Sequence, residues 1–306
     1  MTQRLKGKVA VITGAGSPVG IGRSLALEMA AEGASLVVND IRREDDGTMG
    51  ADKVVEEIKK ANGTAVANYD SVVTMEGAEN IIKTAISNFG RIDILANPAG
   101  GVRAGKTIAE LTEDDWDSDV NVNLKGVFNC CKAAAVEMMK QKSGRIINFS
   151  SGAAFDSPRL VLPPRPDIPA SDRPQGRPRM PLMIAYSSAK AGVLGLTVSL
   201  SKALQEDGIT VNAIVPAAVT DLFKGQRPRW GGGNTEGPDW VVPIIVYLAT
   251  DEAQNITGQF FYSCAGDICI YDRPMQIPGP HRFIRKMGKW TVDELSEVIP
   301  ALLEAD

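Results

Sequence analysis

Short runs of apolar residues alternate along this chain with longer segments in which apolar positions recur every three or four residues. A short run bounded by polar residues or glycine is typical of a buried strand, and the longer recurrence is typical of a helix. Strands are predicted at 9–12, 35–39, 64–68, 92–96, 145–149, 211–216 and 259–263. Helices are predicted at 23–31, 51–61, 75–88, 113–140 and 239–249, and a further one begins near Tyr186.

The order of these elements predicts the fold class. Strands that alternate with helices build a parallel sheet covered by helices on both faces. We therefore expect an α/β fold with a Rossmann-type, doubly wound parallel sheet, whose ligands bind at the carboxyl ends of the strands. The length of 306 residues, 44% of them hydrophobic, suits one large domain.

Composition narrows the range of partners and sites. The net charge of -4 comes from interspersed residues of both signs, which argues against a nucleic-acid or membrane surface and favours a small-molecule partner. The four cysteines contain no C-x-x-C pair and the one histidine is His281, so neither a metal site nor serine–histidine catalysis is expected. Because the chain has no signal-peptide core and no apolar run near ~20 residues, we expect a soluble, cytoplasmic protein.

A glycine-rich loop separates the first predicted strand from the first predicted helix. Glycines allow a backbone to approach a pyrophosphate, and the helix N-terminus attracts its charge. Asp40 follows the next strand, where a carboxylate binds the adenosine ribose hydroxyls and repels a 2′-phosphate, so NAD is favoured over NADP. Arg42 and Arg43 weaken this preference. A tight turn and a solvated Asp40 remain as the alternative interpretation. The loop residues are Gly14, Gly16, Gly20, Ile21 and Gly22.

Tyr186 and Lys190 are four positions apart at the start of a predicted helix, which places them on one face. The lysine charge is expected to lower the pKa of the tyrosine, so that the pair donates and accepts a proton near neutral pH. A surface tyrosine beside a solvated lysine is the alternative. Two further polar residues stand out: Asn123 lies within a predicted helix that it disfavours, and Ser151 follows a predicted strand.

These residues occur in the order found in one enzyme family. The chain resembles the short-chain dehydrogenases/reductases over residues 5–265, through the Thr13-Gly14 loop, Asn97-Pro98-Ala99-Gly100, Asn123, Ser151, Tyr186 with Lys190, and the strand before Pro216. Asn39-Asp40, the run 65–72 and Gly90-Arg91-Ile92-Asp93 are most similar to the (3R)-hydroxyacyl-CoA dehydrogenase domains of peroxisomal multifunctional enzymes.

The resemblance implies a role for each residue. Tyr186 acts as acid and base, Lys190 lowers its pKa and binds the nicotinamide ribose, Ser151 binds the substrate oxygen, and Asn123 holds a relay water. Hydride passes between NAD and a secondary alcohol or ketone. A homodimer or homotetramer is implied, paired through the helices that carry Asn123 and Tyr186. The implied cofactor contacts are Gly14, Gly16, Gly20, Ile21, Gly22, Asp40, Asp70, Asn97, Ala99, Gly100, Tyr186, Lys190, Pro216 and Thr220.

Three features depart from the family pattern. Gly14 and Gly20 are six positions apart rather than four, which puts the affinity for the cofactor in doubt. The turn Pro216-Ala217 has alanine for the family's glycine. An insertion of about 156–181 separates Ser151 from Tyr186; its five arginines either contact an anionic substrate such as a coenzyme A thioester or form a solvated or subunit-contacting loop.

The expected organisation is a single domain, 1–270, followed by an extension, 271–306, that packs on the body or on a neighbouring subunit. Leu222, Phe223, Trp230 and Trp240 are candidate pocket walls, although aromatic residues there are equally typical of a core. The expected activity is NAD-dependent interconversion of a secondary alcohol and a ketone on a hydrophobic or 3-hydroxyacyl-CoA-like substrate. Two alternatives stay open: a steroid or aromatic secondary-alcohol dehydrogenase, and a cofactor-binding subunit with little catalytic activity.

Overall fold

The computed structural model describes residues 3–103, 105–155, 183–223, 236–264 and 266–271. All of them belong to a compact unit, Met1–Tyr271, which is distinct from a second unit, Asp272–Asp306. The predicted insertion, Trp230 and the predicted C-terminal helix therefore lie outside the described residues. Among the helices described, none has the length and apolar character needed to cross a membrane.

The described unit is built on one sheet of eight strands in the order β3-β2-β1-β4-β5-β6-β7-β8. Neighbouring strands are parallel from β3 to β7, and β8 is antiparallel to β7. The sheet reverses its strand order at β1 and β4, which is the doubly wound arrangement predicted. The strands are β1 (Val9–Ile12), β2 (Ser35–Asn39), β3 (Thr64–Asn68), β4 (Ile94–Asn97), β5 (Gly144–Phe149), β6 (Ile209–Ala217), β7 (Phe260–Cys264) and β8 (Asp267–Tyr271).

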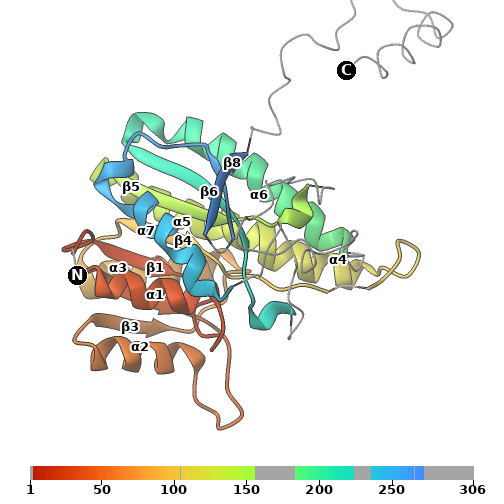
Figure 1. Ribbon diagram of the computed structural model, residues 1–306, viewed down its shortest axis with the longest axis horizontal. Helices are drawn as coiled ribbons and strands as arrows, with labels where there is room; N and C mark the ends of the chain where they lie inside the picture. The colour runs from red at the N-terminus through yellow and green to blue at the C-terminus, as the bar shows by residue number, and fades with distance from the viewer. Residues whose placement is uncertain (1–2, 104, 156–182, 224–235, 265, 272–306) are drawn as a thin grey trace, which may run out of the picture. The chain divides into compact units, whose positions relative to one another are not determined.

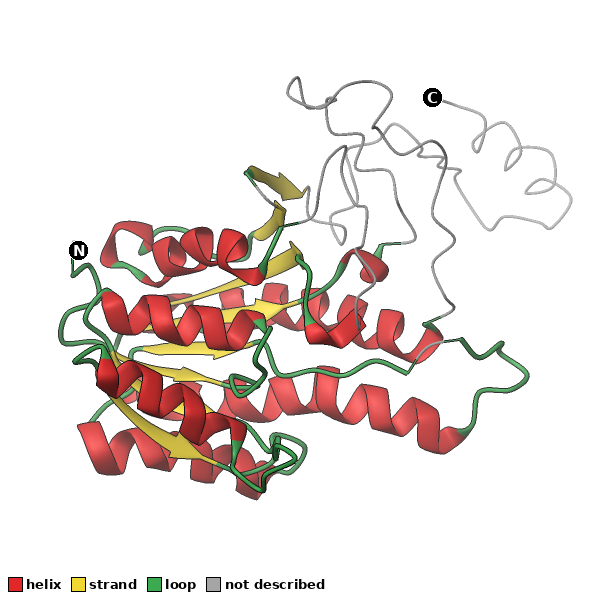
Figure 2. Cartoon of the chain, turned by 60° about the horizontal axis from the view of Figure 1, so that its bottom comes forward, coloured by secondary structure: helices red, strands yellow, loops and turns green. Residues whose placement is uncertain are grey.

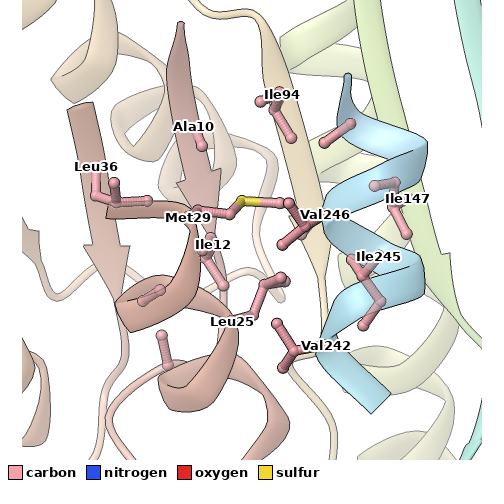
Figure 3. Packing of buried hydrophobic residues seen from close by; sticks show 14 of the residues in the cluster. Ala10, Ile12, Leu25, Met29, Leu36, Ile94, Ile147, Val242, Ile245 and Val246 are labelled. Atoms are coloured by element: carbon pink, nitrogen blue, oxygen red, sulfur yellow. The ribbon is translucent and has the colours of Figure 1, made fainter. Parts of the chain in front are cut away.

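Helices cover both faces of the sheet (Figures 1 and 2). One apolar cluster joins α1, α2 and α7 to one face, and a second joins α3, α5 and α6 to the other. Figure 3 shows the first cluster, where Leu25 and Met29 of α1 and Val246 of α7 meet strand residues. The helices are α1 (Ile21–Ala31), α2 (Gly50–Lys60), α3 (Met75–Phe89), α4 (Glu113–Val120), α5 (Gly126–Gln141), α6 (Ile184–Ala203) and α7 (Val242–Ala249).

The predicted helix 113–140 is interrupted in its middle. Between α4 and α5 the backbone forms a π-helical turn, Asn121–Lys125, with Asn123 at its centre. The Asn123 side-chain amide donates to the carbonyls of Gly101 at 2.7 Å and Asp119 at 2.9 Å. A wider turn of this kind accommodates one extra residue within a helix and is frequent at functional sites.

Strand β8 was not predicted. Its residues alternate between half-buried and exposed, with Ile268 55% and Ile270 60% exposed, in contrast to the fully buried central strands. Its inward face contributes Tyr271, whose ring stacks on Phe155 at 4.6 Å between centroids. The strand therefore covers the edge of β7 and contacts the segment that follows Ser151.

Candidate active site

A cavity of about 400 Å³ opens at the carboxyl ends of the parallel strands. This is the position where ligands bind in doubly wound sheets. It brings together most residues that the sequence singled out, from the glycine loop to α6. The predicted residues that line it are Gly14, Gly20, Ile21, Gly22, Asp40, Asp70, Ala99, Gly100, Asn123, Tyr186, Lys190, Pro216 and Thr220.

The glycine loop packs so closely against its neighbours that side chains are excluded. Gly14 has φ +59°, and a Cβ atom added to it would lie 2.6 Å from the Cα of Ala99. A Cβ on Gly22 would lie 2.5 Å from the carbonyl oxygen of Gly14. Because both glycines permit this contact, the N-terminus of α1 reaches the cavity, and the first N–H groups of a helix are suited to binding an anion.

Asp40 is fixed at the end of β2 by two backbone hydrogen bonds. Its Oδ2 accepts from the N–H of Gly16 at 2.7 Å, and its Oδ1 accepts from the N–H of Arg42 at 2.8 Å. Gly16 itself does not line the cavity, since its Cα faces Gly50 and Asp40. The guanidinium of Arg42 donates to Glu44 at 2.9 Å, and this hydrogen bond raises the pKa of Arg42.

Asp70 is oriented by a network of amide side chains. Asn68 Nδ2 donates to Asp70 Oδ2 at 2.8 Å, and Asn80 Nδ2 donates to Oδ1 at 3.3 Å. Asn39, which is buried, donates to Asn68 Oδ1 at 2.8 Å and to the Asp70 carbonyl at 2.9 Å. The end of β3 thus presents a carboxylate of defined orientation to the cavity.

Asn97 ends β4, and its side chain points into the protein. Its side chain is 1% exposed and donates to Asn148 Oδ1 at 3.0 Å and to Cys131 Sγ at 3.4 Å, so it joins β4, β5 and α5 inside the protein and does not line the cavity. Asn148 in turn donates to Thr197 of α6. The Asn97 side chain therefore joins interior elements, and Ala99 and Gly100 form the adjacent cavity wall; its contact with a cofactor stays a prediction.

Tyr186 and Lys190 lie together in the first turns of α6, and each is 4% exposed. The Lys190 ammonium is 5.6 Å from the centroid of the tyrosine ring and donates to the carbonyl of Phe149 at 2.9 Å. Burial lowers the pKa of Lys190 to about 8. Burial also raises the pKa of Tyr186 to about 12, opposed by a hydrogen bond with Ser151 and reinforced by the Asp119 charge.

The pKa of Tyr186 thus moves in the opposite direction to the one expected from its lysine neighbour. The expectation considered only the attraction between an ammonium and a phenolate. In the folded protein both groups are removed from water, and burial disfavours whichever form carries the charge. Tyr186 is therefore a neutral phenol at pH 7, a form that is chemically able to donate a proton.

Ser151 lies beside Tyr186, although it does not form part of the cavity wall itself. Its hydroxyl accepts from the N–H of Ala153 at 3.2 Å and so begins the short turn Gly152–Ala154. Its hydrogen bond with Tyr186 brings the two predicted catalytic hydroxyls together. The next residues along the chain, 156–182, lie outside the described part of the structure.

Asn123 is fully buried, and its Oδ1 atom has no hydrogen-bond partner among the described groups. A Cβ atom on Gly100 would lie 2.7 Å from this oxygen and 3.6 Å from Lys190 Nζ, so the space beside Gly100 adjoins both groups. Buried polar atoms are usually paired, often by an ordered water. Asn123, which the sequence marked as unfavourable in a helix, therefore places an unpaired hydrogen-bond acceptor near Lys190.

Asp221, which lines the cavity, makes a contact with the glycine loop that the sequence did not indicate. Ser17 Oγ donates to Asp221 Oδ2 at 2.7 Å, and the N–H of Val19 donates to the same oxygen at 3.3 Å. The N–H of Asp221 donates back to the Val19 carbonyl at 3.0 Å. Ser17 and Val19 of the glycine loop are thus held against the segment after β6. The only signal was an acidic residue next to Thr220.

The candidate pocket walls are only partly confirmed. Leu222 lines the cavity and is 39% exposed. Trp240 is 49% exposed and does not line it. Trp230 and the side chain of Phe223 are outside what the structure describes.

Among curated proteins, the chain is 39% identical over 269 residues to the peroxisomal hydratase-dehydrogenase-epimerase of Saccharomyces cerevisiae, covering 85% of this chain and 26% of that protein. It is 34% identical over 274 residues to the (2S)-[(R)-hydroxy(phenyl)methyl]succinyl-CoA dehydrogenase subunit BbsD of Thauera aromatica, covering 86% and 97%. It is 36% identical over 269 residues to a 3-oxoacyl-[acyl-carrier-protein] reductase of Synechocystis sp., covering 84% and 95%. The chain thus spans about a quarter of the first relative and nearly all of the other two.

Solved structures and family models agree with these matches. The fold superimposes on a crystal structure of a short chain dehydrogenase from Mycobacterium avium with a TM-score of 0.80 and 35% identity, covering 98% of this chain and 96% of that one. The family model for short chain dehydrogenases matches residues 8–161 and 174–229, and the unmatched residues between them lie within the predicted insertion. With its cavity residues in the family order, this chain belongs to the short-chain dehydrogenases, a family of oxidoreductases that bind a nicotinamide cofactor.

Proposed function

We propose that the protein is an NAD-dependent dehydrogenase that interconverts a secondary alcohol and a ketone. The observation that carries the proposal is a single cavity lined both by Asp40, at the end of β2, and by Tyr186, Lys190 and Asn123. Such a cavity suits a dinucleotide whose ribose is bound by Asp40 and whose nicotinamide meets the substrate beside a proton donor.

The residues present fit a dinucleotide. The close contacts of Gly14 and Gly22 leave the N-terminus of α1 open to a pyrophosphate. Asp40 offers its remaining lone pairs to the adenosine ribose hydroxyls, and Lys190 holds the nicotinamide ribose. NAD is favoured because the Asp40 carboxylate repels a 2′-phosphate, while Arg42, the cation best placed to attract one, already binds Glu44.

The cofactor supplies or accepts a hydride at C4 of its nicotinamide. For reduction, the neutral phenol of Tyr186 donates its proton to the ketone oxygen, while Ser151 hydrogen-bonds the same oxygen and stabilises the charge that develops on it. For oxidation, the Tyr186 oxygen takes the proton of the alcohol. After Tyr186 has donated its proton, a water bound to Asn123 Oδ1 and near Lys190 Nζ would relay a new proton to it from solvent. This water would also pair the Asn123 oxygen that otherwise has no partner.

The preferred substrate class is a 3-hydroxyacyl or 3-oxoacyl thioester. Its support is the family context, since the relatives named above act on a succinyl-CoA derivative or on 3-oxoacyl-[acyl-carrier-protein]. An aromatic secondary alcohol is the second candidate, because the Thauera aromatica protein is named for a hydroxy(phenyl)methyl group. The Thauera aromatica protein is also named as a subunit of its enzyme. This supports the third candidate, in which the present chain is a cofactor-binding subunit with little catalytic activity of its own.

We also propose that the protein is a homodimer or homotetramer. Apolar side chains on α4 and α5 are 39% to 48% exposed, and a contact between copies of the chain would cover them. These side chains are Trp116, Phe128, Val136 and Met139.

The experiment compares substrates at fixed cofactor. A 3-hydroxyacyl-CoA, the corresponding free 3-hydroxy acid and 1-phenylethanol are each offered with NAD, and the nicotinamide absorbance is followed. We expect turnover of the thioester in the wild type and loss of it in Tyr186→Phe. Turnover of 1-phenylethanol alone would establish the second candidate. Binding of NAD without turnover of any secondary alcohol would establish the subunit interpretation.

A further inference from the structure

Asp221 binds a set of hydrogen-bond donors that suits an anion. Its Oδ2 atom accepts from the Ser17 hydroxyl at 2.7 Å and from the Val19 N–H at 3.3 Å. The Arg42 guanidinium lies 3.9 Å from the same oxygen. A hydroxyl, a backbone N–H and a guanidinium are the groups with which proteins bind phosphate. Here a carboxylate of the protein itself occupies them.

These donors lie beside the ribose-binding carboxylate. Gly16, the residue before Ser17, donates its N–H to Asp40 at 2.7 Å, and Arg42 donates its own N–H to Asp40 at 2.8 Å. The donor set is therefore carried by the two chain segments that hold Asp40, the glycine loop and the end of β2. A phosphate attached to the ribose hydroxyl that Asp40 binds would extend toward this set.

The charges around the donors are mainly negative. Asp40, Glu44 and Asp221 surround one arginine, Arg42, which donates to Glu44 at 2.9 Å. Arg43 is directed elsewhere, since its guanidinium donates to the carbonyl of Gly47 at 2.7 Å. All of these groups are at least partly exposed, so their interactions are those of a surface in contact with solvent and salt.

We propose that Asp221 is a second determinant of the preference for NAD over NADP, because its carboxylate fills the donors that would otherwise hold a 2′-phosphate. This inference rests on the proposed function and deepens its cofactor specificity. Asp40 repels the phosphate at the ribose, and Asp221 removes the groups that would stabilise it. The contact is made by Ser17 and Val19, which both lie within the lengthened glycine loop.

The test measures binding rather than turnover. Dissociation constants of NAD, NADP, 5′-ADP and 2′,5′-ADP are determined by calorimetry for the wild type, Asp221→Asn and Asp221→Ala. Glu79→Gln, which removes one charge from the exposed side of α3, serves as the matched control. For Asp221→Asn and Asp221→Ala we expect the ratio of the NADP constant to the NAD constant to fall about tenfold, the size of one close charge interaction near a surface.

Further variants separate the donors from the charge. Adding Ser17→Ala to Asp221→Asn is expected to reverse part of the gain in 2′,5′-ADP affinity, and raising the salt concentration is expected to reduce it. An unchanged ratio in both Asp221 variants, or an equal loss of NAD and NADP affinity, would overturn the proposal. If the wild type binds neither dinucleotide, the proposed function fails, whereas a gain in 2′,5′-ADP affinity on removing Asp221 still supports this role.

Discussion

The two ends of the cavity are built by different physical means. At the proposed adenosine end, Asp40 and Asp70 are partly exposed and are held by hydrogen bonds to backbone N–H groups and amide side chains. At the proposed catalytic end, Asn123, Tyr186 and Lys190 are at most 4% exposed. In the proposed function, the first end would select a ligand through fixed charges in contact with water. The second would control protonation by removing charged groups from water, and this burial lowers the stability of the fold.

The largest effect is expected from Tyr186→Phe, which removes the proposed proton donor and leaves the shape of the side chain almost unchanged. Tyr186→Phe removes only the phenol oxygen from a side chain that is 4% exposed. Because positioned proton transfer contributes about 10²- to 10⁴-fold to a rate, we expect kcat to fall by that factor. The NAD dissociation constant is expected to stay within about threefold of the wild type. Single-turnover kinetics and fluorescence titration measure the two quantities. An unchanged rate would remove Tyr186 from the reaction.

Lys190→Met tests how much the burial of a charged group lowers the free energy of unfolding. The pKa of Lys190 is lowered from 10.5 to about 8, so the unfolded chain binds its proton more tightly than the folded protein. The free energy of unfolding is therefore reduced below pH 8 and recovers as the pH rises toward 10.5. We expect Lys190→Met to be more stable than the wild type by on the order of 2 kcal/mol at pH 7, with activity lost.

Urea unfolding from pH 7 to 11 measures this difference. The advantage of Lys190→Met is expected to shrink as the pH rises from 8 toward 10.5, since the wild-type lysine is then neutral in the folded protein and only the unfolded chain still binds the proton. Above pH 10 the stability of both proteins falls, because the pKa of Tyr186 is raised from 10 to about 12 and the unfolded tyrosine loses its proton first. A variant less stable than the wild type at every pH would contradict this account.

A glycine pair tests the close packing at the adenosine end. Gly22→Ala places a Cβ atom 2.5 Å from the Gly14 carbonyl, so we expect a loss of about 1–3 kcal/mol in the free energy of unfolding, together with weaker NAD binding. Gly195→Ala is the control, because it lies inside α6 with no described atom within 4 Å of the added Cβ. It is expected to stabilise the protein by about 0.5–1 kcal/mol. Equal effects would show that close packing is not the cause.

The smallest effect is expected from the exposed part of the adenosine end. Asn80 donates to Asp70 over 3.3 Å at the surface, whereas Asn68 donates to it over 2.8 Å in a partly buried position. Asn80→Ala is expected to change NAD affinity by less than threefold, and Asn68→Ala by about tenfold, since it leaves buried partners unpaired. Calorimetric titration of both variants decides. A larger effect at Asn80 would mean that the exposed contact orients Asp70.

Much of this architecture follows from the sequence, because the signals were local. Strands β1 to β7 are short apolar runs in a layered fold, and their bounds match the prediction within two or three residues. The glycine loop, Asp40, Tyr186 and Lys190 were found because each chemistry requires a residue type at a characteristic spacing. Their convergence on one cavity follows from the parallel sheet, which places the carboxyl ends of its strands at one edge.

The features that were missed depend on contacts between distant segments. The direction of the Tyr186 pKa shift requires knowing how deeply α6 is buried. The interior position of Asn97 depends on Asn148 and Cys131, which lie on other elements. Asp221 contacts Ser17, which is 204 residues away along the chain, and no local sequence pattern predicts such a contact. Strand β8 follows β7 without an intervening helix and pairs with it antiparallel, so it does not fit the alternation of strands and helices on which the prediction rested.

The π-helical turn at Asn121–Lys125 determines how α4 and α5 are rotated relative to each other about their common axis. An α-helix rotates by about 100° per residue, so deleting one residue from this turn would rotate α4 relative to α5 by that amount. At present α5 directs Val127, Cys130 and Met138 into the core, while Asn123 directs its amide toward Gly101. A regular helix would satisfy only one of these orientations. The one additional residue in this turn thus lets the continuous segment from α4 to α5 pack into the core on one side and direct Asn123 to the proposed proton relay on another.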